Sequence, residues 1–139
     1  MVAIELPPEY GYVVGVGVAS SFLLLWQGIK VGQMRKKHKI EYPTMYSTDN
    51  KLFNCYQRAH QNTLENYPQF LMLLFTGGLQ YPTINAVAGL IWIAGRVSYS
   101  LGYYTGEPAK RMKGGYAYFG LLTMLGTTVS FALRLLGYL

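Results

Sequence analysis

Polar side chains recur at helical spacing in CYQRAHQNTLENYPQFL, residues 55–71, just before the apolar run LMLLFTGGL. At 100° per residue, one stripe of a helix about 60° wide contains Arg58, Asn62, Glu65 and Gln69. An ionisable side chain inside a membrane costs about 2.5 to 3.5 kcal/mol on insertion scales. The two charges of this stripe therefore indicate a partner or a binding site.

A second polar face follows in the next apolar segment, where Arg96, Tyr99 and Tyr103 recur at three-then-four spacing. Two such helices run antiparallel, and a rise of about 1.5 Å per residue sets Glu65 at the depth of Arg96. We expect these two side chains to lie near enough to compensate each other's charge.

Two interpretations fit these faces. One is a structural ion pair with tyrosines in an interfacial aromatic belt. The other is a polar pocket that opens to the cytoplasm, with cationic loops at its rim, a carboxylate below and tyrosine hydroxyls along one wall. The neutral amides of Asn62 and Gln69, which a simple ion pair does not need, favour the pocket. Such a pocket suits a small zwitterionic ligand with excess negative charge.

The sequence shows no arrangement typical of a nucleophile borne by the protein, no phosphate-binding loop and no metal-ligand set. Cys55 is the single cysteine, so an intrachain disulfide is excluded and a metal site is not expected. His60 points away from the stripe and is interpreted as a packing or interface histidine rather than a base. If the protein is an enzyme, the reactive group arrives with a cosubstrate.

The elements that must position these groups are helices, and we predict an all-α fold in one domain over residues 1–139. The composition is 51% apolar and 13% charged, which favours a membrane protein. A membrane-crossing helix needs about 20 mostly apolar residues. Apolar segments and their punctuation by Gly77, Gly78 and Pro82 predict four spans, at about 11–30, 54–79, 84–104 and 115–134.

Basic residues concentrate in the connections after the first and third spans, in RKKHK at 35–39 and in GEPAKRMKG at 106–114. Positively charged loops stay cytoplasmic, so the termini are expected on the opposite side. RKKHK either determines this topology and contacts lipid headgroups or contacts a ligand. GEPAKRMKG is either a plain turn or a loop that closes over the pocket.

Small residues at Gly11, Gly15 and Ala19 would let another backbone approach closely, either within the chain or from a second copy. A chain of this size has little interior, so a ligand cavity forms more easily between subunits. We therefore expect an oligomer.

Three stretches together carry a family resemblance: FNCYQRAHQNTLENYPQFL, GRVSYSLGYYTGEPAKRMKG and EYPTMYSTD. They resemble the membrane-associated proteins of eicosanoid and glutathione metabolism, the MAPEG family, and within it most closely the microsomal glutathione transferase 3 subfamily. The resemblance covers almost the whole chain. It implies a four-helix homotrimer of the endoplasmic reticulum membrane, or of the mitochondrial outer membrane, with glutathione bound between subunits on the cytosolic side.

The resemblance also implies roles for single residues. By similarity to the leukotriene C4 synthase branch, glutathione would be bound by Lys36, Arg58, Asn62, Glu65, Tyr99 and Tyr103. An arginine after the third helix would face the glutathione sulfur as the catalytic group. GEPAKR is one residue longer than the loop of the synthase, which leaves Lys110 or Arg111, and we choose Arg111.

Three positions depart from the synthase pattern. Lys36, beside Arg35, replaces an arginine, so the contact would survive as a point charge. His60 replaces a glutamine, and Asn66 stands where the synthase has a tyrosine.

The resemblance predicts a glutathione transferase and peroxidase that attacks lipophilic electrophiles or lipid hydroperoxides, and leukotriene C4 synthase activity is one candidate. The alternative is a non-enzymatic scaffold that presents lipid, like the lipoxygenase-activating protein of the same family. A channel is a third class, but the stripe ends halfway across the membrane, which favours a closed pocket.

Overall fold

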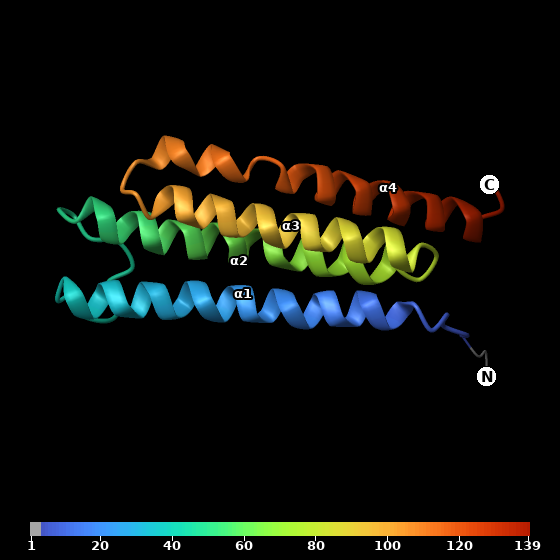
Figure 1. The fold of residues 1–139 in the computed structure, drawn as a ribbon, viewed down its shortest axis with the longest axis horizontal. Coiled ribbons are helices and arrows are strands. Elements are labelled where there is room, and N and C mark those ends of the chain that lie inside the picture. Colours follow the sequence, from blue (N-terminus) through green and yellow to red (C-terminus); the bar gives the residue numbers. More distant parts are fainter. Residues whose placement is uncertain (1–3) are drawn as a thin grey trace.

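The computed structural model describes residues 4–139, and all the regular structure in this range is helical. Four long helices lie side by side, and both ends of the chain lie at the same end of the bundle (Figure 1). The predicted all-α class is confirmed. The elements are α1 Tyr10–Lys37, α2 Lys51–Gly77, α3 Pro82–Tyr103, the 3₁₀ helix η1 Pro108–Gly114 and α4 Ala117–Leu135.

The helices differ from the predicted spans mainly at their ends. α1 continues to Lys37, past residue 30, because the basic stretch after the apolar run is also helical. α2 begins at Lys51 rather than near residue 54, since the Asn50 side chain caps it by accepting a hydrogen bond from the Phe53 N–H. The apolar run marks the part of a helix that can lie in lipid, whereas capping residues mark the ends of the helix.

Within the described residues, α1, α3 and α4 are long and apolar enough to cross a membrane. α2 is 27 residues long and lies beside them, but its polar stripe makes it too hydrophilic by composition alone. The fourth predicted crossing therefore remains a prediction.

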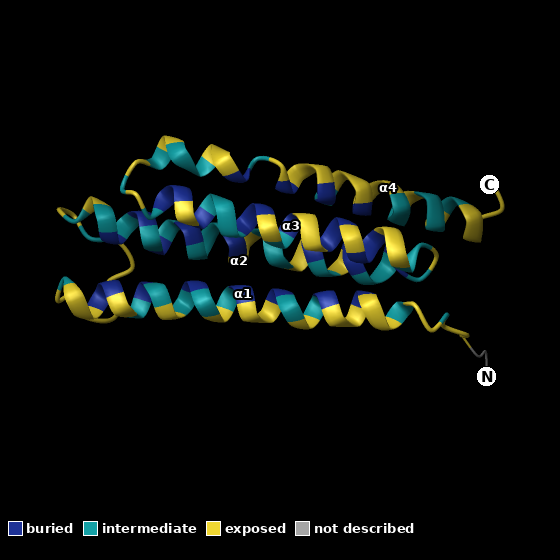
Figure 2. Ribbon diagram, in the orientation of Figure 1, coloured by how far each residue is buried: buried dark blue, intermediate teal, exposed yellow. Residues whose placement is uncertain are grey.

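Exposed residues lie along the outer faces of the bundle, including those of α1 and α4 (Figure 2), and many of them are large and apolar. Phe22, Phe119 and Leu122 are more than half exposed. Inside, Phe70 stacks on Trp92 with the ring centroids 3.9 Å apart. An apolar exterior around a packed interior is what a bilayer requires of a helical bundle.

A buried asparagine joins three helices at the end of the bundle where the termini lie. Asn85 of α3 donates to the carbonyls of Leu73 and Leu74 on α2, both at 3.0 Å, and it accepts from Thr127 of α4. Asn85 is fully buried. Its amide group therefore has partners on both sides, as polar groups in a low-dielectric interior require.

At the opposite end, Arg35 ties the connection between α1 and α2 to the bundle. Its Nη1 donates to the carbonyls of Ile40, Glu41 and Thr44 at 2.8–3.3 Å. Its guanidinium also lies over the Tyr42 ring, 4.2 Å from the centroid. The first cation of RKKHK is thus a structural residue of this chain.

The predicted GEPAKRMKG connection is an ordered element rather than a plain turn. Its residues form η1, which packs closely on α3 through glycines. A Cβ atom at Gly102 would overlap the carbonyl of Lys110, and one at Gly114 would overlap the backbone of α3 at Gly95. These contacts set the position of the segment that contains Arg111.

Gly11 and Gly15 of α1 do not pack closely against another helix of the same chain. A Cβ atom at Gly11 or Gly15 would meet no atom within 4 Å. Both line an open apolar groove together with Ala19 and Val87 of α3. The intramolecular reading of this pattern is wrong for Gly11 and Gly15, and contact with a second copy remains a prediction.

We expect Gly102→Ala to displace η1, because the added methyl group would occupy the position of the Lys110 carbonyl. Overpacking of this kind costs about 1 to 3 kcal/mol. Thermal unfolding in detergent measures the loss. Gly126→Ala is the matched control, since its methyl group would meet no atom within 4 Å. Equal melting temperatures for the two variants would contradict the close approach.

Candidate functional site

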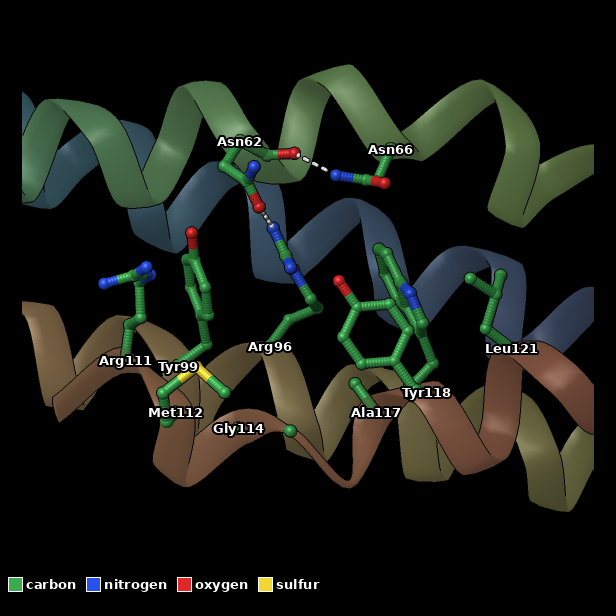
Figure 3. Close-up of a pocket in the computed structure, with 12 residues that line it drawn as sticks. Asn62, Asn66, Arg96, Tyr99, Arg111, Met112, Gly114, Ala117, Tyr118 and Leu121 are labelled. Atoms are coloured by element: carbon green, nitrogen blue, oxygen red, sulfur yellow. Dashed lines mark hydrogen bonds between the residues drawn. The ribbon is translucent and has the colours of Figure 1, made fainter. Parts of the chain in front are cut away.

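A cavity of about 260 Å³ lies between α2, α3 and the segment from η1 to α4. Figure 3 shows Arg111 at one end of it and Leu121 at the other, with Asn62 and Arg96 between them. The lining passes from arginine, tyrosine and amide groups to tryptophan, alanine and leucine. The lining residues are Asn62, Asn66, Trp92, Arg96, Tyr99, Arg111, Met112, Gly114, Gly115, Ala117, Tyr118 and Leu121.

Arg96 is the buried cation of this cavity, with 7% of its surface exposed. Its Nη2 donates to Asn62 Oδ1, and its Nε donates to Thr63 Oγ1 at 3.1 Å. The guanidinium lies 4.3 Å from the centroid of the Tyr99 ring, a distance typical of a cation–π contact. Neutral acceptors and an aromatic face thus hold this charge.

Gln27 of α1 donates to the same threonine hydroxyl as Arg96 and so links this arginine to α1. Its Nε2 donates to Thr63 Oγ1 at 3.0 Å and to Ser100 Oγ at 2.7 Å. All three residues are fully buried. The hydrogen-bonded cluster of Gln27, Thr63, Ser100 and Arg96, called here the central polar cluster, joins α1, α2 and α3.

The proton positions in the central polar cluster follow from its geometry. The Thr63 hydroxyl donates to the Ala59 carbonyl, and the Ser100 hydroxyl donates to the Arg96 carbonyl, both at 2.9 Å. Each hydroxyl has one proton, so both can only accept from Gln27. The amide nitrogen of Gln27 must therefore face inward, and both lone pairs of the Thr63 oxygen are used, by Gln27 and Arg96.

Arg111 lines the cavity, whereas Lys110 does not. Arg111 Nη1 donates to the carbonyl of Pro108 at 2.8 Å within η1, and Lys110 pairs with Glu107 at 3.4 Å. The choice of Arg111 over Lys110 thus agrees with the geometry of this segment. A catalytic role for Arg111 remains a prediction.

Glu65 and Arg96 do not form the expected pair. Glu65 instead makes a bidentate ion pair with Arg58 of its own helix, at 2.8 and 3.2 Å. Residue spacing predicted that Glu65 and Arg96 lie at similar depth. It did not show that Arg58, two turns away on the same face of α2, is a nearer partner for Glu65. The pair lies on an exposed face of α2, and neither residue lines the cavity.

The two tyrosines of the predicted site have different surroundings. Tyr99 lines the cavity beside Arg96. Tyr103 is buried against Cys55 and Ala59, and its ring meets that of Tyr99 edge-on with the centroids 5.3 Å apart. Within one chain, Tyr103 therefore packs against the ring of Tyr99 and does not line the cavity.

Lys36 lies apart from the cavity in this chain. It is exposed near the end of α1 and shares a shallow groove with Lys39, Glu41 and Tyr42. His60 is also apart, because it faces Gly28 of α1, in keeping with its interpretation as a packing residue. The structure thus brings together Asn62, Tyr99 and Arg111 of the predicted site.

No group of three or more His, Cys, Asp or Glu side chains in residues 4–139 is arranged to hold a metal ion. Among the carboxylates of residues 4–139, Glu65 pairs with Arg58 and Glu107 pairs with Lys110. The site must therefore be judged by its arginines, amides and tyrosines.

Several lining residues, among them Trp92, Asn66 and Tyr118, had not been assigned a role from the sequence. Trp92 precedes Arg96 by four residues, and Asn66 follows Asn62 by four, so helical periodicity would have placed both beside the site. Tyr118 comes from α4, and no spacing rule relates it to α2 or α3.

A model of the MAPEG family matches residues 13–131. The chain belongs to this family. Together with three helices able to cross a membrane, membership makes it an integral membrane protein. The resemblance drawn from the sequence is thereby confirmed at the level of the family.

Individual MAPEG relatives align over most of the chain. An uncharacterised protein of Synechocystis is 34% identical over 107 residues, which are 76% of this chain and 75% of that protein. Human microsomal glutathione S-transferase 2 is 33% identical, over 80% of this chain and 76% of the relative. The mouse protein of the same name is 37% identical, over 69% and 64%. The predicted subfamily, microsomal glutathione transferase 3, remains a prediction.

Replacing Gln27 by leucine is expected to destabilise this MAPEG chain, because two buried hydroxyl oxygens would each lose a donor. An intramolecular hydrogen bond between neutral groups contributes about 0.5 to 1.5 kcal/mol. Thermal unfolding in detergent measures the effect. Gln33→Leu changes an exposed glutamine of the same helix and should leave the melting temperature unchanged. A similar melting temperature for both variants would show that Gln27 is not a structural link.

Proposed function

We propose that this protein is a membrane-bound glutathione transferase that also reduces lipid hydroperoxides. The observation that carries the proposal is a cavity with Arg111 at its polar end and apolar side chains at the other, in a chain related to glutathione S-transferases. Such a cavity suits a polar thiol cosubstrate that meets a lipophilic partner.

Arg111 would activate the thiol. A thiolate is a far better nucleophile than a thiol, and a cation at about 4 to 6 Å can lower a thiol pKa by about one to three units. One nitrogen of the Arg111 guanidinium donates to the Pro108 carbonyl, which orients the group. Its remaining N–H groups stay available for the sulfur of glutathione.

The same thiolate would serve two reactions. In conjugation, sulfur forms a bond to an electrophilic carbon, which expels a leaving group or takes up a proton. In peroxide reduction, sulfur attacks oxygen, the O–O bond breaks and the alcohol leaves with a proton. A second glutathione then displaces water to form the disulfide. Leukotriene C4 synthesis would be one instance of the conjugation.

Glutathione would be held by Lys36, Arg58, Asn62, Glu65, Tyr99 and Tyr103, at a site shared between copies of a homotrimer. Two features support a shared site. Arg58 and Glu65 lie on an exposed face of α2, which is costly in lipid unless another subunit covers it. Lys36 lies apart from the cavity of its own chain, so it can contribute only to a site of another copy.

The proposed orientation sets all four long helices across the membrane and the basic segments in the cytosol. RKKHK and η1 then both border the mouth of the site. In a eukaryotic cell, the endoplasmic reticulum or the mitochondrial outer membrane would contain the protein.

Arg111→Ala should raise the pKa of the bound glutathione thiol by about one unit or more, because it removes the adjacent cation. The thiolate absorbance in the ultraviolet at neutral pH would then fall. Lys110→Ala is the matched control, since this lysine lies next in sequence but pairs with Glu107 outside the cavity.

An unchanged thiolate signal in Arg111→Ala would remove this residue from thiol activation. Wild-type protein that turns over neither a chromogenic electrophile nor a fatty-acid hydroperoxide with glutathione would favour the non-enzymatic lipid scaffold instead.

A shared site predicts complementation between two defective variants. Lys36→Ala and Asn62→Ala should each weaken glutathione binding in a homotrimer. When the two are coexpressed, mixed trimers contain some sites with both residues intact. Glutathione-dependent activity per subunit should then exceed that of either variant alone. Activity no higher than the average of the two variants would place both residues in the same subunit's site.

A further inference from the structure

Asn66 lies one turn beyond Asn62 on α2 and lines the same cavity. Figure 3 shows it on the side of Asn62 that faces away from Arg111, toward Tyr118 and Leu121. Nothing in the proposed glutathione site accounts for it.

The orientation of the Asn66 amide is fixed by its own helix. Its Nδ2 donates to the backbone carbonyl of Asn62 at 2.8 Å. A carbonyl oxygen can only accept, so the nitrogen of Asn66 must face Asn62. The Oδ1 atom then points away from Asn62, as Figure 3 shows, and no described residue donates to it.

The Asn62 amide has the opposite arrangement, with its oxygen rather than its nitrogen bonded within the chain. Its Oδ1 accepts from Arg96, which can only donate, so the amide nitrogen is the group left over. Along the helix axis the two residues are about 6 Å apart. The cavity therefore offers a hydrogen-bond donor at Asn62 and, deeper, an acceptor at Asn66.

We propose that Asn66 is a specificity-determining residue that accepts a hydrogen bond from an O–H group of the lipophilic substrate. This inference rests on the proposed transferase function. The acceptor lines a cavity whose wall also includes Trp92, Ala117 and Leu121, and a substrate without a donor leaves it unpaired. The site thus favours electrophiles that bear a hydroxyl or hydroperoxyl group near the reacting atom.

A pair of unsaturated aldehydes differing by one hydroxyl tests this preference. With a 2-alkenal, the glutathione thiolate forms a bond to the β-carbon, the C=C electron pair shifts to give an enolate, and a proton from water restores the aldehyde. A 4-hydroxy-2-alkenal of equal length reacts in the same way and has an O–H group beside the β-carbon. The ratio of the two kcat/KM values isolates the hydroxyl.

Asn66→Leu should lower the ratio, hydroxylated over plain, by roughly three- to tenfold, the range expected for one hydrogen bond. Activity with the plain 2-alkenal should not fall, because the variant has no acceptor that this substrate leaves unpaired, and the KM for glutathione should stay near wild type. Leucine is the better helix former, so the variant is expected to fold. Asn66→Asp, which keeps a side-chain oxygen acceptor, should retain more of the hydroxyl preference than Asn66→Leu.

Thr123→Leu is the matched control. Thr123 also bonds to the carbonyl four residues earlier, that of Phe119, but it is exposed on α4 outside the cavity. The ratio of the two kcat/KM values in Thr123→Leu should equal that of the wild type. An unchanged ratio in Asn66→Leu, or a raised KM for glutathione with both aldehydes, would overturn the inference. Absence of turnover in the wild type would overturn the proposed function itself.

Discussion

The central polar cluster is the constraint on which the rest of the bundle depends. Helices in lipid gain little from burying apolar surface against each other, so packing and hydrogen bonds must hold them in register. The amide of Gln27 reaches α2 and α3 at once through Thr63 and Ser100. Arg96 takes the remaining lone pair of Thr63 and is thereby aimed at Asn62. One set of hydrogen bonds thus fixes both the helix packing and the floor of the cavity.

Much of this arrangement could be predicted from the sequence. Apolar runs located the helices, and periodicity placed Asn62 and Tyr99 on faces that meet. The choice between Lys110 and Arg111 came from kinship, and it agrees with the orientation of η1. The helices could be located because helical periodicity is a local property that needs only the neighbouring residues along the chain.

The partner of each buried group was harder to predict, because it depends on side-chain directions across helices. Depth alone favoured Glu65 for Arg96, whereas the hydroxyl of Thr63 and the amide of Asn62 are nearer. Gln27 could not be distinguished from any other polar residue of α1. The position of η1 depends on close contacts at Gly102 and Gly114, which cannot be predicted from the composition of the segment.

The ion pair between Arg58 and Glu65 has a consequence for the thermodynamics of ligand capture. Each charge already has a partner within the helix, so the empty protein avoids an isolated charge in the membrane. A zwitterionic ligand that engages both must exchange partners rather than add new ones. Its observed affinity is then the difference between two sets of ion pairs, which limits how tightly this face can hold such a ligand.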